Sequence, residues 1–141
     1  MSDIVNLKPE AVWRFFDEIT RIPRPSKKEE KIVAYLIDFA KSRSLEYRKD
    51  STGNVVIRKG ASPGMENRPV VVLQSHVDMV CEKRGDVNFH FDTDPIRTRV
   101  EDGWVRAEGT TLGADCGIGM AAELAVLDAD DLAHGPVECL F

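Results

Sequence analysis

The stretch Val70-Val71-Val72-Leu73-Gln74-Ser75-His76-Val77-Asp78 joins four apolar residues to a polar segment that carries a histidine and an aspartate. A short continuous apolar run predicts a buried strand, and open α/β sheets place their functional side chains beyond the carboxyl ends of the strands. His76 and Asp78 are two residues apart, so they point to the same side of an extended chain. We therefore expect His76 to offer one ring nitrogen to a metal ion while Asp78 fixes the ring from its other nitrogen.

A second acidic residue, Asp115, lies in the segment Gly113-Ala114-Asp115-Cys116-Gly117 and is a candidate hard oxygen ligand. The H-x-D spacing is short, and polar residues also occur at strand ends for solvation alone, so it needs a site around it to count. The same spacing recurs at His90-Phe91-Asp92, where the alternation of apolar residues places His90 on a polar, solvated face. His134 is interpreted as a helix cap or a surface residue.

Composition limits the classes of function. The chain has 141 residues and a formal net charge of -5 at pH 7, a length typical of one modest domain with its own core. Scattered basic residues in an acidic chain argue against a nucleic-acid partner. Residues 1–6 lack the features of a signal peptide, and no stretch has membrane-spanning length. We expect a cytoplasmic protein without a membrane partner, whose three cysteines are reduced.

Helices and strands alternate along the chain, which predicts an α/β layer structure. Pro9 fits the first position of a helix, and Ser26 with Glu29 forms a capping box for a second helix. The expected elements, in order, are a helix over 9–21, a helix over 26–42, a hairpin of strands 45–48 and 54–58, a strand over 70–73, a hairpin of strands 96–100 and 104–107, a helix through 120–127, and a buried strand over 136–141.

The segment Gly117-Ile118-Gly119-Met120-Ala121-Ala122 fits a variant of the dinucleotide-binding fingerprint. That fingerprint requires a buried strand directly before it, because the turn must aim helix N–H groups at a pyrophosphate. Residues 108–112 are loop-like instead. We therefore interpret the glycines as allowing tight turns around Asp115 and a close approach of the following helix to the sheet.

Two segments together carry a family resemblance. Residues 73–80 (Leu-Gln-Ser-His-Val-Asp-Met-Val) and 110–119 (Thr-Thr-Leu-Gly-Ala-Asp-Cys-Gly-Ile-Gly) closely resemble the metal-site segments of the M20 metallopeptidases, in particular their aminoacyl-histidine (Xaa-His) dipeptidase branch. The resemblance extends over nearly the whole chain, including residues 22–26 and 94–96. It implies the N-terminal part of a zinc-peptidase-like catalytic domain, with a mixed sheet flanked by helices.

The resemblance also implies roles for individual residues. His76 ligates one of two zinc ions, with cobalt or manganese as substitutes, and Asp115 bridges both ions. Asp78 is the catalytic residue that orients or polarises His76, and the peptide bond after Asp115 is expected to be cis. Cys116 departs from the family, which commonly has Asn or Asp there, and we interpret it as a packing substitution.

The general-base glutamate, the remaining ligands and a smaller lid domain follow later in the family, so residues 1–141 are expected to be an N-terminal portion of the catalytic domain. The resemblance implies a parent enzyme that hydrolyses small Xaa-His peptides and forms a homodimer, and an inactive fragment. Two alternatives stay open. One is another M20-type amidohydrolase or peptidase, and the other is a non-catalytic binding or structural module.

Overall fold

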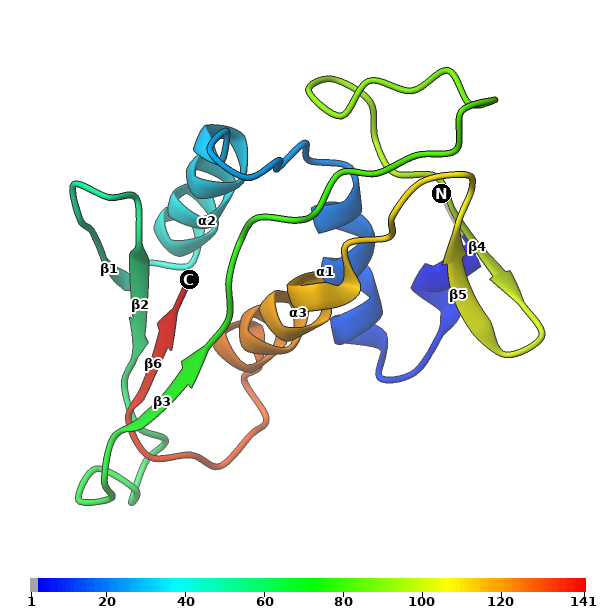
Figure 1. Ribbon diagram of the computed structural model, residues 1–141. Coiled ribbons are helices and arrows are strands. Elements are labelled where there is room, and N and C mark those ends of the chain that lie inside the picture. The colour runs from blue at the N-terminus through cyan, green and yellow to red at the C-terminus, as the bar shows by residue number, and fades with distance from the viewer. Residues whose placement is uncertain (1–2) are drawn as a thin grey trace.

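The computed structural model describes residues 3–141. In chain order it contains a short 3-10 helix (Asp3–Asn6), α1 (Glu10–Thr20), α2 (Glu30–Ser42), β1 (Glu46–Lys49), β2 (Val55–Lys59), β3 (Val71–Gln74), β4 (Thr98–Glu101), β5 (Trp104–Ala107), α3 (Ala114–Asp128) and β6 (Val137–Leu140), as Figure 1 shows. The predicted elements are all present, with ends displaced by a few residues. None of the helices in this described range is long and apolar enough to cross a membrane.

Four strands form one sheet in the order β1-β2-β6-β3. β2 pairs antiparallel with both β1 and β6, while β3 pairs parallel with β6. A parallel pair needs a crossover connection, and the segment that contains α3 supplies it. The sheet is therefore mixed, which confirms the predicted α/β class. β4 and β5 form a separate antiparallel hairpin, also as predicted.

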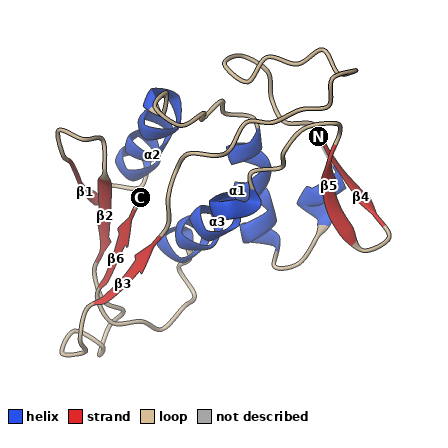
Figure 2. Cartoon of the chain, viewed as in Figure 1, coloured by secondary structure: helices blue, strands red, loops and turns tan. Residues whose placement is uncertain are grey.

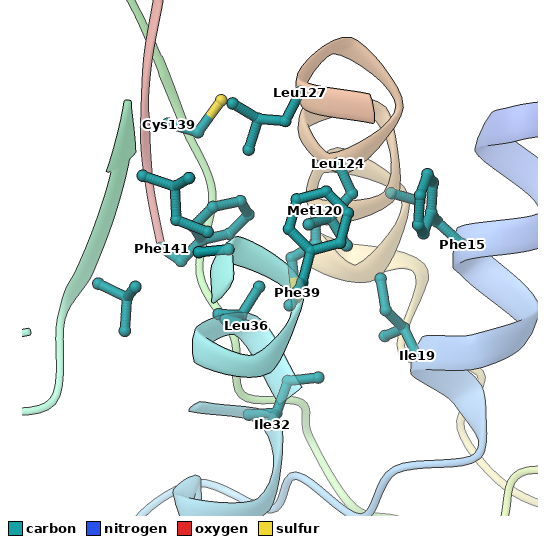
Figure 3. Close-up of a cluster of buried hydrophobic side chains, with 14 of the residues drawn as sticks. Phe15, Ile19, Ile32, Leu36, Phe39, Met120, Leu124, Leu127, Cys139 and Phe141 are labelled. Carbon is teal, nitrogen blue, oxygen red and sulfur yellow. The ribbon is translucent and has the colours of Figure 1, made fainter. Parts of the chain in front are cut away.

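The hydrophobic core lies between the sheet and the helices, which gather on one side of it (Figures 1 and 2). Alternate residues of β6, Val137 and Cys139, are buried while their neighbours are partly exposed, as the two-residue period of a strand requires. Figure 3 shows side chains of α2 and α3 converging on Cys139 and Phe141; the labelled ones are Ile32, Leu36, Phe39, Met120, Leu124 and Leu127. This core fixes α3 over the sheet, and the N-terminal end of α3 carries Asp115.

The prediction of a buried strand at residues 70–73 is wrong for most of its side chains. Val70, Val71 and Val72 are 54%, 52% and 57% exposed. β3 is an edge strand with β6 as its neighbour in the described sheet, and the helices lie over the opposite face from Val72. A run of apolar residues predicts a strand. Whether its side chains are buried also depends on which elements cover the two faces and the edge of the sheet.

The capping box is also wrong. α2 begins at Glu30, and its N-cap residue, Glu29, makes no side-chain cap hydrogen bond. Ser26 lies four residues before the helix and donates its hydroxyl hydrogen bond to Oδ2 of Asp78 instead. A hydrogen bond from a hydroxyl to a carboxylate is stronger than one from a backbone N–H group to a hydroxyl. The tertiary contact with Asp78 therefore replaces the local helix cap.

Candidate metal centre

His76 and Asp78 follow the end of β3 directly. The pairing of β3 with β6 continues through Ser75, whose N–H donates to the carbonyl of Leu140 at 3.0 Å. His76 comes next, and its Nδ1 lies 3.0 Å from Oδ1 of Asp78. The predicted contact between the imidazole and the carboxylate two residues later is therefore present in the structure.

Asp115 reaches the same imidazole from the start of α3. Gly113 has φ +72°, a left-handed conformation that glycine adopts without strain, and Asp115 and Cys116 interrupt the helical backbone. The Asp115–Cys116 peptide bond is cis, as the resemblance implies. Oδ1 of Asp115 lies 2.9 Å from Nε2 of His76, so the two segments, 39 residues apart in sequence, meet at one ring.

The helix approaches the sheet closely at this point because Gly119 has no side chain. A Cβ atom there would lie 2.6 Å from Sγ of Cys116 and 3.4 Å from Cβ of Ser75. The thiol thus packs into the space that the glycine leaves free. This position agrees with the interpretation of the glycine-rich segment as a means of close packing.

Hydrogen bonds control the charges of the site. The contact with Asp115, followed by that with Asp78, raises the pKa of His76. The hydroxyl of Ser26, at 2.5 Å, lowers the pKa of Asp78, and His76 lowers it further. The Asp115 side chain is 97% exposed and that of His76 is 49% exposed. A cation that approaches from solvent therefore has access to both.

The donor set fits a transition-metal ion of the zinc class. In a neutral His76 that carries its hydrogen on Nδ1, Asp78 would accept that hydrogen, and Nε2 would be free to bind a cation beside Asp115. His76 and Asp115, whose Nε2 and Oδ1 atoms lie 2.9 Å apart, are the residues that would hold such an ion. The sulfur of Cys116 also lies in this cluster, whose ligand atoms are all within 4.8 Å of one another.

A cavity of about 680 Å³ opens beside the imidazole, between α2 and the carboxyl ends of β3 and β6. Its lining includes Val33, Ile37, Gln74, His76, Asp78 and Phe141. The lining combines these apolar side chains with polar and charged ones, among them Glu29, Lys49 and Asn54. The cavity thus places room for a small ligand beside His76 and Asp78.

The three predicted site residues, His76, Asp78 and Asp115, come together in the structure. The other two histidines stay outside this cluster. His90 is exposed, as predicted, and His134 is partly buried and contacts the carbonyl of Gly135 in a loop after α3 rather than capping the helix. Ser26 is a site residue that was predicted to cap a helix. Its contact with Asp78 spans 52 residues, so no local pattern in the sequence indicates it.

Comparisons with known proteins identify similar chains, although no family model matches the sequence. The chain is 47% identical over 140 residues to the cytosol non-specific dipeptidase of Escherichia coli (strain K12), a match that covers 99% of this chain and 29% of that protein. The aminoacylhistidine dipeptidase of Vibrio alginolyticus superposes with a TM-score of 0.96 at 50% identity, over 99% of this chain and 28% of its own.

A third structure, a dinuclear metal-binding peptidase of the M20 family from Bacillus subtilis, has a TM-score of 0.54 at 15% identity, over 92% of this chain and 34% of its own, and is similar in fold alone. The chain spans less than a third of the length of each of the first two proteins. The resemblance seen in the sequence is confirmed, and the chain has the fold of the N-terminal region of an M20 peptidase.

Proposed function

We propose that residues 1–141 are the N-terminal portion of the catalytic domain of a metal-dependent dipeptidase that hydrolyses Xaa-His dipeptides. The observation that carries the proposal is the position of His76, whose two ring nitrogens lie 3.0 Å and 2.9 Å from the carboxylates of Asp78 and Asp115. A histidine held by one carboxylate and facing another is a typical arrangement of a zinc ligand with its supporting residue.

In this proposal His76 would hold one zinc ion through Nε2, and Asp115 would be the ligand shared with a second ion, with cobalt or manganese as substitutes. Zinc supplies a polarised scissile carbonyl and an activated water. Asp78 acts on the ring from its far side: it accepts the Nδ1 hydrogen, fixes the tautomer and increases the electron density that Nε2 donates. Ser26 keeps Asp78 ionised and oriented through the hydrogen bond at 2.5 Å.

The described residues supply fewer ligands than a two-zinc centre needs, since the cluster consists of His76, Asp115 and the thiol of Cys116. We assign the general base and the remaining ligands to other parts of a longer protein, as the coverage of 29% of the Escherichia coli relative suggests. That relative is named as a cytosol enzyme, which supports a cytoplasmic location. A homodimer remains part of the proposal through the family resemblance.

The substrate class rests on the named relatives and on the cavity beside His76. The Vibrio alginolyticus protein is named an aminoacylhistidine dipeptidase, and a volume of about 680 Å³ accommodates a small peptide. The Escherichia coli relative is named a non-specific dipeptidase. A dipeptidase with a broader choice of carboxyl-terminal residue is therefore the second candidate.

The test is hydrolysis of alanyl-histidine and alanyl-phenylalanine by the full-length protein, before and after treatment with a chelator. We expect faster hydrolysis of alanyl-histidine, loss of activity on chelation, and recovery with zinc, cobalt or manganese. His76→Ala and Asp115→Asn should abolish turnover, whereas His90→Ala, which changes an exposed histidine outside the cluster, should not. Equal rates on both peptides favour the second candidate, and no turnover of any peptide by the metal-loaded protein refutes the enzyme and favours a binding or structural module.

A further inference from the structure

A buried arginine connects the two segments that carry the candidate ligands. Arg24 lies in the loop between α1 and α2 and is 1% exposed. Its Nη1 donates to the carbonyl oxygens of Val77 and Asp78 at 2.9 Å and 3.2 Å, and its Nη2 donates to that of Gly113 at 2.6 Å. The guanidinium thus contacts the backbone next to His76 on one side and the backbone two residues before Asp115 on the other.

The glycines of the second segment make room for this guanidinium. A Cβ atom at Gly113 would lie 2.6 Å from Nη2 of Arg24, and one at Gly117 would lie 2.7 Å from the same atom. Both distances are too short for real carbon–nitrogen contacts. The backbone around Asp115 can therefore approach Arg24 only because these two positions lack side chains.

The loop that carries Arg24 is itself attached to the first segment. The N–H of Met79 donates to the carbonyl of Arg24 at 3.1 Å, and Pro25 forms a parallel bridge with Met79. Both the main chain and the side chain of Arg24 therefore hold residues 77–79. The connection to Gly113, by contrast, depends on the side chain.

Arginine is suited to this task because its planar fork presents several N–H donors in a fixed geometry. Burial lowers the pKa of Arg24 to about 10, and Asp78 opposes that shift, so the group stays protonated at neutral pH. Lysine would keep the charge, but its single ammonium cannot reproduce the fork. A buried charge is also costly unless it is well hydrogen-bonded. The charge of Arg24 can therefore be buried here only with hydrogen bonds such as its three to the carbonyl groups.

We propose that Arg24 is a positioning residue of the metal centre. Its guanidinium fixes residues 76–78 relative to residues 113–115, and thereby holds the His76 imidazole and the Asp115 carboxylate at a separation that allows both to bind one metal ion. This role rests on the proposed function. Arg24 is buried, and the hydrogen bonds of its guanidinium within the described residues go to backbone carbonyls, so it acts through the two ligands rather than on a substrate.

The test compares three variants of the full-length protein by cobalt(II) titration, with cobalt as a spectroscopic probe for zinc. Arg24→Lys removes the fork, and Gly117→Ala places a methyl group against Nη2 while leaving the charge intact. Arg43→Lys is the matched control, because Arg43 connects the end of α2 to Asp128 at the far end of α3, with Nε 2.5 Å from Oδ1. Urea unfolding without metal reports the loss of stability for each variant.

We expect Arg24→Lys and Gly117→Ala to weaken cobalt affinity about 10- to 100-fold, the usual effect of losing a group that supports metal ligands, and to change the visible absorption of the bound ion. Arg43→Lys should lower stability and leave both the affinity and the spectrum unchanged. If Arg24→Lys does not fold, Gly117→Ala decides.

Cobalt affinity and spectra within about twofold of wild type in the folded variants would reduce Arg24 to a structural residue and overturn the proposal, with the metal centre itself intact. If His76→Ala leaves cobalt binding unchanged in the wild-type background, the proposed metal centre fails, and this role for Arg24 fails with it.

Discussion

Replacing Glu123 with glutamine should make the stability of the chain less dependent on pH. Glu123 lies on α3, is 4% exposed, and has an Oε2 atom without a hydrogen-bond partner among the described residues. Burial raises its pKa from 4.5 to about 7, against the contrary influence of the neighbouring Ser75 and Cys139. The carboxyl therefore stays protonated in the folded protein over a range in which it ionises in the unfolded chain.

The sign and size of the effect follow from this difference. Because the folded pKa is the higher one, the folded state holds the proton more tightly, and stability is lost as the pH rises from 4.5 towards 7. With these two values, ionisation destabilises the fold by about 1 kcal/mol at pH 5 and about 3 kcal/mol at pH 8. Cys139 faces the same carboxyl, but burial raises the pKa of its thiol to about 12, so it does not titrate in this window.

The assay is urea unfolding from pH 4.5 to 8, followed by the fluorescence of the two tryptophans. The difference in unfolding free energy between wild type and Glu123→Gln isolates Glu123, because every other titrating group is shared. That difference should shift against the wild type by about 2 kcal/mol between pH 5 and pH 8, on top of a constant offset from burying the amide. Glu108→Gln, which makes the same change at an exposed position, is the matched control. A difference that stays flat with pH would refute the reasoning.

Three further outcomes are expected. Leu124 is fully buried on α3, so Leu124→Ala should lower the free energy of unfolding by about 2–5 kcal/mol. Leu132 is 47% exposed, so Leu132→Ala should change that free energy by less than about 0.5 kcal/mol. Equal losses in the two variants would contradict the described core. Asp78→Asn should weaken zinc affinity of the full-length protein about 10- to 100-fold in calorimetric titration, and unchanged affinity would remove Asp78 from its supporting role. The isolated chain should bind zinc weakly, and its cobalt form should lack a sulfur-to-metal charge-transfer band if Cys116 is a packing residue; such a band, lost in Cys116→Ser, would make the thiol a third ligand.

The parts of the site that were predictable from the sequence are those that depend on local spacing. His76 and Asp78 are two residues apart just beyond an apolar run, and a strand places such a pair on one side whatever its surroundings. The contact of His76 with Asp115 spans 39 residues, and only the resemblance of the two segments together predicts it. Neither segment alone contains the information that they meet.

The parts that were not predictable depend on tertiary contacts. The exposure of Val72 follows from the edge position of β3 and from the one-sided arrangement of the helices, which no pattern within the strand records. The contacts of Arg24 with Val77 and Gly113 span 53 and 89 residues. An arginine is usually exposed, so its sequence position favours a surface residue, and only the folded backbone shows that carbonyl groups surround it.

The segment Pro23-Arg24-Pro25-Ser26 both ends α1 and supports the candidate metal centre. Its prolines predict the end of α1, and they also fix φ at alternate residues while the position before each proline is biased to an extended conformation. In an extended chain Arg24 and Ser26 point to the same side, and both reach the segment that follows β3: Arg24 binds the carbonyls of Val77 and Asp78, and Ser26 binds the Asp78 carboxylate. Since the hydroxyl of Ser26 is committed there, α2 begins later and without a side-chain cap, so the wrong capping box and the support of the metal centre have one physical cause.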